Sequence, residues 1–554
     1  MNRLLTLHHP AAARRYYAEG LWQVDTLYAL AERWAAERGN MPALRDHHRR
    51  VSWRALVAEA DRVAAALHRQ GLVPGDRVSV WMNNRIEAVA IFLACSRNGY
   101  VFNTSLHATY TPAEVALLLD RVSSRALFAQ TEHGAGVVGN EIFALARAQP
   151  AMRAIFALPG CGEASGPTQA LPYPTAVDGA QPVPSADPDQ VVYLAFTSGT
   201  TGHPKGVMHS DNTLLANARA MVADWGFNSE TILLSLSQMS HHIGTVALCQ
   251  ALVGGFELVL YDTAADIHSI DWIEQTGATY VMGVPTHAMD ILTALAERQQ
   301  ERLGRVSVFY LAGAPIPRAT AQALLERGIT PQNVYGMTEN GSHQYTLPGD
   351  DVDSITGTCG KACAAYEIAI FDQDARDIEV PTGQIGEIGG RGAMRMLGYF
   401  GNQTATEEAF NAGGWFMSGD LGRNNERGDL EIVGRCKDMI IRGGHNIHPA
   451  RIEDLAMRHP SVSKAAAVPV ADKRLGERVC LIVTATGAIA GSELLDHLAA
   501  TGLSKYDMPE FFVLAERLPL GPTGKVLKRE LVQWLQSGRM VPQPVRWPAA
   551  GVAA

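Results

Sequence analysis

The sequence predicts an α/β fold of layered parallel sheets covered by helices, followed by a small α+β unit. Short apolar strands alternate with segments of helical periodicity along most of the chain, which is typical of parallel sheets with helices on their faces. The 554 residues, 47% of them hydrophobic, can bury more than one core. Beyond Lys437 and Asp438 a helix, two strands and a second helix form a separate small set, which suggests a domain boundary there.

The first clear helix begins at Trp53. Apolar residues recur at helical spacing from Trp53 to Leu67, Ser52 is a suitable N-cap, and Gly71 is a suitable stop. Residues 77–82 then predict a strand and residues 86–96 a second helix. The alternation continues with predicted strands at residues 191–196, 231–236, 256–261, 279–284 and 306–311. A stretch rich in Pro, Gly and Ala at residues 159–188 predicts a surface connection.

The C-terminal part has a pattern of its own. Helices are predicted at residues 450–457 and 493–500, and strands at residues 465–470 and 478–484. The pattern by itself also allows one continuous domain. Residues 541–554, which are rich in proline and alanine, predict a loose tail.

Composition excludes several classes of protein. A net charge of -9 argues against a nucleic-acid partner. The sequence contains no apolar run long enough for a membrane span and no apolar leader, so a cytoplasmic location is expected. The seven cysteines are odd in number and irregularly spaced, which favours reduced thiols, and the paired histidines lack a second ligand cluster for a metal.

A loop rich in glycine and hydroxyl groups carries the strongest functional signal. It follows the predicted strand at 191–196 and contains Thr197, Ser198, Gly199, Thr200, Thr201, Gly202 and Lys205. Glycines allow the backbone to approach phosphate oxygens, and the lysine adds a positive charge. The loop is not a Walker A motif, because Lys205 follows Pro204 and precedes Gly206. A loop without any ligand is the alternative interpretation, so other segments must support the hypothesis of polyphosphate binding.

Further motifs follow in order along the chain. Tyr335-Gly336-Met337-Thr338-Glu339 offers an aromatic face for a base, a hydroxyl for a phosphate and a carboxylate for Mg²⁺. Asp420 lies in a Ser-Gly-Asp sequence and provides a carboxylate that can accept two ribose hydroxyls. The remaining motifs are Gly434-Arg435, Gly443-Gly444-His445-Asn446-Ile447 and Pro522-Thr523-Gly524-Lys525.

Together these motifs closely resemble the adenylate-forming superfamily, which includes acyl- and aryl-CoA synthetases, firefly luciferase and the adenylation domains of peptide synthetases. The resemblance covers about residues 21–535. It implies a large N-terminal domain, residues 1–436, that binds ATP and an acid. It also implies a small mobile α+β C-terminal domain, residues 437–540, that carries a catalytic lysine and rotates about Lys437.

The resemblance implies a reaction in two steps with ATP, Mg²⁺ and coenzyme A. A carboxylate first attacks the α-phosphorus of ATP to give an acyl-adenylate and pyrophosphate, and a thiol then displaces AMP. Positioning and charge neutralisation supply most of the catalysis of such a displacement.

The resemblance assigns roles residue by residue. The implied catalytic residues are Lys525, Thr338, Glu339 and His241, with Glu339 as the magnesium ligand. The implied ATP- and AMP-binding residues are Thr197, Ser198, Gly199, Thr200, Thr201, Gly202, Lys205, Gly313, Ala314, Pro315, Tyr335, Gly336, Met337, Thr338, Asp420, Arg435 and Lys525. Lys437 is the implied hinge. Gly443 and Gly444 are the implied CoA-binding residues, and His241, His242 and Met337 are implied to line the acid pocket.

The substrates are predicted less sharply than the reaction. The Gly443-Gly444 segment resembles the CoA-type loop, although His445 replaces the usual glutamate. The segment from Tyr335 to Tyr345 most resembles medium-chain fatty acid and cyclohexanecarboxylate CoA ligases, which implies a small to medium, mostly apolar monocarboxylate; an aryl acid is the next choice. A separate enzyme that loads a carrier protein, a luciferase-like oxygenase and a non-catalytic adenylate-binding relative remain as alternatives. A homodimer is compatible with the resemblance.

Overall fold

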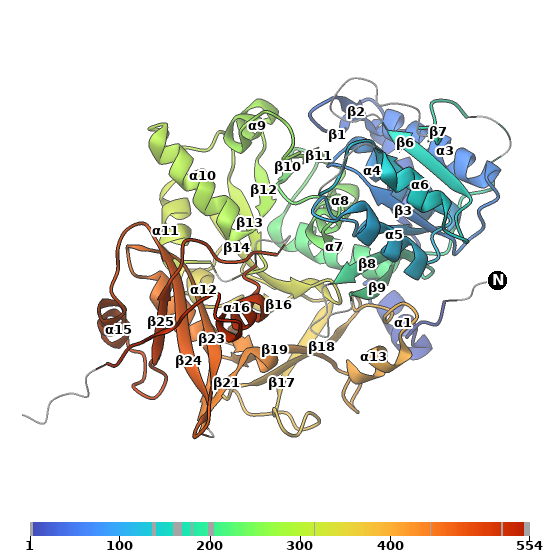
Figure 1. Cartoon of the computed structure of the whole chain (residues 1–554). Coiled ribbons are helices and arrows are strands. Elements are labelled where there is room, and N and C mark those ends of the chain that lie inside the picture. Colours follow the sequence, from blue (N-terminus) through green and yellow to red (C-terminus); the bar gives the residue numbers. More distant parts are fainter. Residues whose placement is uncertain are drawn as a thin grey trace, which may run out of the picture.

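Two large mixed sheets and three layers of helices form most of the molecule (Figure 1). The computed structural model describes residues 4–135, 140–158, 169–177, 179, 181–197, 204–314, 316–443, 445–521 and 525–547. No helix within these residues has both the length and the apolar character that a membrane crossing requires.

The first sheet has seven strands in the order β7-β6-β5-β3-β4-β8-β9. All neighbours pair in parallel except β8 and β9, which form an antiparallel hairpin. The strands are β3 Arg77–Trp81, β4 Val101–Asn103, β5 Ala126–Gln130, β6 Ala154–Leu158, β7 Leu171–Pro172, β8 Val191–Thr197 and β9 Lys205–Ser210.

The second sheet has nine strands in the order β16-β15-β14-β13-β12-β10-β11-β1-β2, and its six central strands, from β14 to β1, are parallel. The strands are β1 Pro42–Arg45, β2 Arg50–Ser52, β10 Ile232–Ser235, β11 Glu257–Leu260, β12 Tyr280–Gly283, β13 Val308–Ala312, β14 Thr330–Met337, β15 Gly341–Tyr345 and β16 Lys361–Ala362.

The middle layer of helices shares one core with both sheets. It contains α2 Leu27–Arg38, α3 Trp53–Arg69, α4 Ile86–Asn98, α7 Asp211–Trp225 and α8 His242–Gly254. The outer face of the first sheet is covered by α5 Pro112–Arg121 and α6 Glu141–Arg147. The outer face of the second is covered by α9 Ser269–Thr276, α10 Pro285–Glu297, α11 Arg318–Glu326 and α12 Val352–Gly357.

A four-stranded antiparallel sheet follows the two large sheets and connects them to the C-terminal unit. Its strands are β17 Tyr366–Phe371, β18 Gly386–Gly392, β19 Phe416–Asn424 and β20 Leu430–Arg435, and α13 Gln403–Glu408 lies between β18 and β19. The N-terminal helix α1, Pro10–Ala18, lies beside this part of the molecule, far from the other N-terminal elements (Figure 1). The Leu7 N–H donates to the Leu397 carbonyl, and Trp22 Nε1 donates to the Ala393 carbonyl at 2.7 Å.

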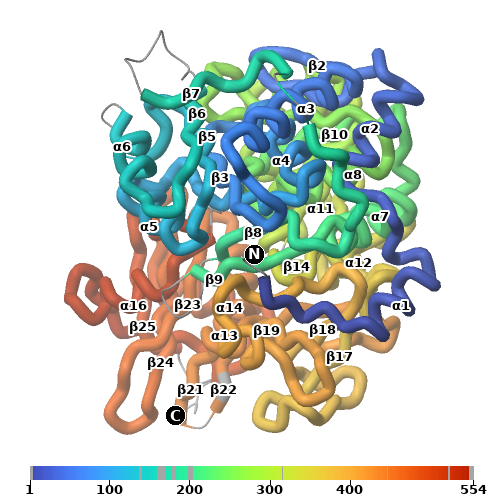
Figure 2. Tube along the Cα trace, turned by 90° about the vertical axis from the view of Figure 1, so that its right-hand side faces the viewer, coloured from blue at the N-terminus to red at the C-terminus, as the bar shows by residue number. Residues whose placement is uncertain are grey.

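The C-terminal unit begins after the 3-10 turn Cys436–Asp438 and has a six-stranded sheet with its own cores. Figure 2 shows it as a separate orange and red body beneath the blue and green layers. Its elements are β21 Ile440–Arg442, β22 His445–Ile447, α14 Pro449–Met457, β23 Val462–Asp472, β24 Gly476–Ala485, α15 Gly491–Ala500, β25 Phe511–Leu514, α16 Lys528–Gln536 and β26 Gln543–Pro544.

The predicted fold class is confirmed, and one prediction about the chain end is wrong. The predicted helix at Trp53 is α3, and Ser52 caps it by accepting a hydrogen bond from the Ala55 N–H. Residues 541–547 are not a loose tail, because β26 pairs with β25 and the Val545 N–H donates to the Glu510 carbonyl. These backbone groups find partners on a sheet edge that would otherwise stay unpaired.

Candidate active site

The phosphate-loop motif connects the two strands of a hairpin. Thr197 at the end of β8 is opposite Lys205 at the start of β9. The ammonium of Lys205 lies 4.7 Å from the centroid of the Tyr399 ring, which holds its charge near the base of the hairpin. The predicted ligands Ser198, Gly199, Thr200, Thr201 and Gly202 lie outside the described residues.

Glu339 lies next to this lysine. Its side chain is buried, and the Tyr399 hydroxyl donates to Oε1 at 3.0 Å. Burial raises the pKa of Glu339, while the hydrogen bond from Tyr399 and the positive charge of Lys205 oppose that shift. Mg²⁺ is commonly held by one or two carboxylates together with substrate phosphates, and a carboxylate beside the phosphate hairpin suits that arrangement. Among the described residues, no three potential ligands form a metal-binding cluster.

Tyr335, Asp420 and Arg435, the predicted nucleoside-binding residues, lie together in the structure. The Tyr335 hydroxyl donates to Asp420 Oδ2 at 2.9 Å, and Arg435 Nε donates to Asp420 Oδ1 at 2.9 Å. Asp420 and Arg435 are opposite each other on β19 and β20, so the sheet register itself brings this pair together. Tyr335 packs on the apolar cluster that includes Ile388 and Leu430, which fixes its ring.

Gly313 and Ala314 follow β13, where they are exposed. Pro315 lies outside the described residues. Gly313 has a φ of +90°, and a Cβ atom there would lie 3.8 Å from Lys525 Cε. The C-terminal unit therefore brings Lys525 directly against the strand end that borders the nucleotide site.

Lys525 is open to solvent, yet protein surrounds it. Its side chain is exposed, yet its pKa is lowered, first by desolvation and then by the positive charge of Arg435, while Asp420 opposes the shift. Lys525, Arg435 and Asp420 thus share one electrostatic environment, although Asp420 and Arg435 come from adjacent strands of one sheet and Lys525 from a segment of the C-terminal unit.

The carbonyl of Thr338 has a partner that the sequence did not indicate. His209 Nε2 donates to this carbonyl at 2.6 Å, and His209 Nδ1 lies 3.0 Å from the Thr213 hydroxyl. A carbonyl can only accept, so the proton of the neutral ring is on Nε2. His209 lies at the end of the phosphate hairpin, so it links the hairpin to the Tyr335–Glu339 motif.

The two neighbouring histidines predicted to line the acid pocket lie in different places. His241 precedes α8 and stacks on His107, with 4.3 Å between ring centroids. His242 is the first residue of α8 and stacks on His209 at 5.6 Å. His242 lines a small cavity behind the Tyr335–Glu339 motif; the other lining residues are His209, Thr213, Leu214, Asn217, Val246, Cys249, Gly341 and Met394. Neither His241 nor Met337 lines this cavity, and Met337 packs instead against the cluster that contains Tyr399.

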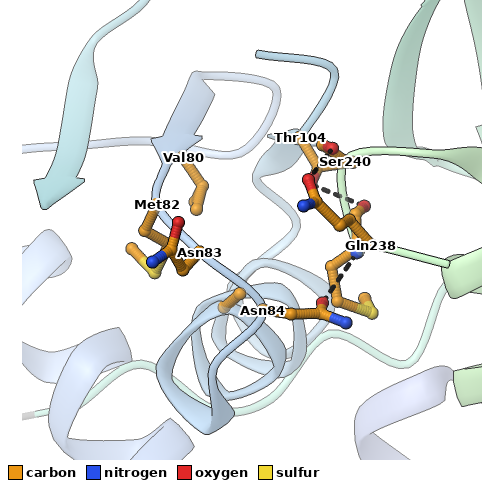
Figure 3. Close-up of a pocket in the computed structure, with 9 residues that line it drawn as sticks. Val80, Met82, Asn83, Asn84, Thr104, Gln238 and Ser240 are labelled. Carbon is orange, nitrogen blue, oxygen red and sulfur yellow. Dashed lines mark hydrogen bonds between the residues drawn. The ribbon is translucent and has the colours of Figure 1, made fainter. Parts of the chain in front are cut away.

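The loop before the two histidines is fixed from behind. The Asn84 side chain accepts from the Met239 N–H at 2.8 Å, and Figure 3 shows this hydrogen bond. Asn84 also donates to the carbonyls of Ser237 and Tyr261. The Thr104 hydroxyl donates to the Met239 carbonyl at 2.8 Å. These bonds hold the start of α8, and hence His242, in one position.

The predicted hinge residue lies between the two parts of the chain, and the predicted CoA residue Gly443 lies within the C-terminal unit. Lys437 is the middle residue of the 3-10 turn between β20 and β21. Gly443 follows β21 with a φ of +59°, and its N–H donates to the Leu475 carbonyl at 2.7 Å. Gly444 lies outside the described residues. His445 Nε2 lies 2.7 Å from an Asp507 oxygen.

The fold and this arrangement of residues define a nucleotide-dependent ligase. Two family models match the chain: the AMP-binding enzyme model over residues 31–400 and the AMP-binding enzyme C-terminal domain model over residues 451–525. The chain belongs to the family of AMP-binding enzymes. It is an AMP-forming acid-thiol ligase of the adenylate-forming superfamily, whose ligases use ATP, Mg²⁺ and coenzyme A.

The relatives include CoA ligases and a component of enterobactin synthase. The medium-chain fatty-acid–CoA ligase of Escherichia coli (strain K12) is 30% identical, with 93% of this chain and 91% of the relative covered. Enterobactin synthase component E of the same organism is 28% identical, with 95% and 97% covered. ATP-bound MatB from Rhodopseudomonas palustris is a similar solved structure, with a TM-score of 0.80, 26% identity, and 92% and 99% of the two chains covered.

Replacing Glu339 with Gln should weaken the response to Mg²⁺. We expect adenylation to fall by about 100-fold and the Mg²⁺ concentration for half-maximal rate to rise, because the carboxylate would be the charged ligand of Mg²⁺ in this position. Since the pKa of Glu339 is raised, the wild-type rate should fall as the pH drops through that raised pKa, and more Mg²⁺ should move the fall to lower pH. Adenylation rates over a grid of pH and Mg²⁺ check this. An unchanged Mg²⁺ response in Glu339→Gln would contradict the role.

Proposed function

We propose that this ligase adenylates a small to medium, mostly apolar monocarboxylic acid and transfers the acyl group to coenzyme A. The observation that carries the proposal is the position of Lys525 against Gly313, beside the Tyr335, Asp420 and Arg435 group. A lysine from a separate sheet domain has no structural need to reach this strand end. Its presence there suits a reaction between ATP and an acid bound close by.

In the first step the acid carboxylate forms a bond to the α-phosphorus of ATP, and the bond to pyrophosphate breaks. Asp420 would accept the ribose hydroxyls, and Tyr335 would present its ring to the base. Lys525 would stay near the oxygens of the carboxylate and α-phosphate, where negative charge shifts during the displacement. Lys205 would oppose the charge of the departing pyrophosphate. Mg²⁺, when bound by Glu339 and the phosphates, neutralises phosphate charge.

In the second step the thiol of CoA loses its proton to solvent and forms a bond to the acyl carbon, and the bond to AMP breaks. The thiol must reach the acyl carbon, and Lys525 occupies the space beside it in the present arrangement. The C-terminal unit would therefore have to rotate between the two steps. Lys437, in the turn between the two parts, is the proposed hinge, and Gly443 and Gly444 would border the path of CoA.

The proposed acid has a single carboxylate. The lining of the cavity behind Thr338 contains no arginine or lysine among the described residues and combines apolar side chains with neutral polar ones. A second carboxylate would be buried there without a partner charge, which is costly.

The nature of the acceptor separates the proposal from its alternative. Similarity to the medium-chain fatty-acid–CoA ligase at 30% identity supports CoA, and similarity to enterobactin synthase component E supports a carrier protein as the alternative. The test is thioester formation with ATP, Mg²⁺ and CoA over straight-chain, alicyclic and aromatic monocarboxylates. A CoA-dependent thioester supports the proposal. Pyrophosphate release with no CoA thioester for any acid would favour a carrier protein.

Replacing Lys437 with Pro should separate the two steps. Proline fixes φ near -65°, which suits the present 3-10 turn but opposes a change of backbone angle at this residue. We expect adenylation within about threefold of wild type and thioester formation reduced by about 100-fold or more. Single-turnover measurement of each step checks this, and unimpaired thioester formation would remove Lys437 as the hinge.

A further inference from the structure

His242 has a ring nitrogen that no described residue satisfies. Its Nδ1 lies 3.4 Å from the Tyr193 hydroxyl, and its ring stacks on His209. Within the described part of the chain, no hydrogen bond reaches His242 Nε2. The other polar groups around the cavity are already engaged: His209 with Thr338 and Thr213, and Asn217 with both the N–H and the carbonyl of Ser342.

The cavity offers space beside this histidine. Its size allows about one water molecule in the absence of a bound acid. Gly341, with a φ of +64°, keeps one wall open, because a Cβ atom there would come within 2.8 Å of Asn217 Oδ1. The cavity is directly behind Thr338, whose carbonyl is bonded to the cavity residue His209.

The histidine pair is neutral at ordinary pH. Burial lowers the pKa of His209 to about 4, and burial together with its neighbour His209 lowers the pKa of His242 to about 3. Neutral imidazole offers one donor and one acceptor. The cavity therefore presents a hydrogen-bonding group without a charge, which suits a neutral polar substituent better than a second carboxylate.

A hydroxyl group matches His242 in either tautomer. If the Tyr193 hydroxyl donates to Nδ1, the proton of the ring is on Nε2, which then donates into the cavity. If Nδ1 donates to Tyr193, Nε2 accepts. A hydroxyl both donates and accepts, whereas an ether or a keto oxygen serves one tautomer alone.

We propose that the acid substrate carries a hydroxyl group that pairs with His242 Nε2, and that His242 selects such acids over their deoxy counterparts. This inference rests on the proposed function. The cavity has room for the hydroxyl group in the place of about one water molecule, so the carbon frame of the acid lies outside it. The substrate class is thus a mostly apolar monohydroxy monocarboxylic acid.

The experiment compares acids in matched pairs. The probes are benzoate with 2-, 3- and 4-hydroxybenzoate, hexanoate with its 2- and 3-hydroxy forms, and cyclohexanecarboxylate with its 2-hydroxy form. The readout is kcat/KM for acid-dependent pyrophosphate release. In wild type, at least one hydroxy acid should exceed its deoxy partner by about 10-fold or more, because a bound deoxy acid would exclude water from His242 Nε2 without giving it a hydrogen-bond partner.

Variants of His242 identify the group responsible. His242→Leu should reduce the hydroxy-to-deoxy ratio to about one while the KM for ATP changes less than about twofold. His242→Gln, whose amide both donates and accepts, should retain part of the ratio. His133→Leu removes another buried histidine, which packs against Trp81 away from the cavity, and should keep the wild-type ratio.

The outcomes separate this inference from the function on which it rests. Activity in wild type with deoxy acids favoured in every pair would overturn the hydroxyl assignment and leave the ligase intact. A wild-type preference that survives in a folded His242→Leu enzyme would overturn the role of His242. Absence of pyrophosphate release with every acid would overturn the proposed function and this inference together.

Discussion

Lys525→Ala should lose adenylate formation by about 1000-fold or more while largely retaining thioester formation from a supplied acyl-adenylate. The lysine would supply the positive charge at the reacting oxygens, and removing one such group commonly costs two to three orders of magnitude. The supplied adenylate bypasses that step. Its conversion with CoA needs the same fold and the same nucleoside contacts, because Asp420 and Arg435 stay in place.

Both half-reactions can be followed by rapid quench with one acid. Lys528→Ala is a matched control, since Lys528 is a nearby lysine that pairs with Glu453 at 2.7 Å and does not contact Gly313. It should retain adenylation within about threefold, because a partly exposed ion pair contributes little. Equal losses of both half-reactions in Lys525→Ala would contradict the assigned role.

The enzyme should lose stability steeply as the pH falls from about 6.5 to about 4. Six histidines have pKa values lowered by desolvation to about 3 or 4: the buried His133, His209 and His343 and the half-buried His107, His241 and His242. In the unfolded chain they bind protons near pH 6.5, whereas in the folded state they stay neutral. The unfolded state then binds more protons, so stability falls with falling pH in this window.

Two acidic groups oppose this effect without cancelling it. Burial raises the pKa of Asp211 to about 7 and also raises that of Glu339. The folded state therefore gains stability as these two groups take up protons on acidification. Each such group changes the free energy of unfolding by on the order of 1 kcal/mol per pH unit. Because six histidines act against two acidic groups, the effect of the histidines dominates.

Urea unfolding between pH 7.5 and 4.5 measures this dependence. His133→Phe should give a shallower slope by about one proton, because it removes one buried imidazole beside Trp81 and keeps an aromatic ring. A stability that is constant, or that rises, on acidification over this range would show that these histidines are protonated in the native state.

Local sequence signals predicted the helices and parallel strands well, because their information lies within each segment. Ser52 before the helical periodicity of α3 is one such signal. The antiparallel sheet β17–β20 was not predicted. Its strand β18 is glycine-rich and lacks apolar alternation, since side chains at Gly389 and Gly390 would overlap Phe371 and Tyr366. Packing across the sheet requires glycine at these two positions, and no local sequence pattern reveals that packing.

In the candidate site, too, residues in local motifs could be predicted, whereas residues whose partners are distant in the sequence could not. The motif residues Tyr335, Asp420 and Arg435 could be predicted and do lie together. Tyr399 and His209 could not, because their partners Glu339 and Thr338 are 60 and 129 residues away in the sequence. Nor could sequence distinguish His241 from His242, since only the start of α8 turns them to different neighbours.

Isotope exchange between labelled pyrophosphate and ATP tests the central claim most directly. With Mg²⁺ and an accepted acid but no CoA, wild-type enzyme should return label to ATP, because adenylation is reversible and complete before the thiol binds. Lys525→Ala should show no exchange above background. Exchange that requires CoA, or formation of ADP and phosphate in place of AMP and pyrophosphate, would contradict an acyl-adenylate made at this site.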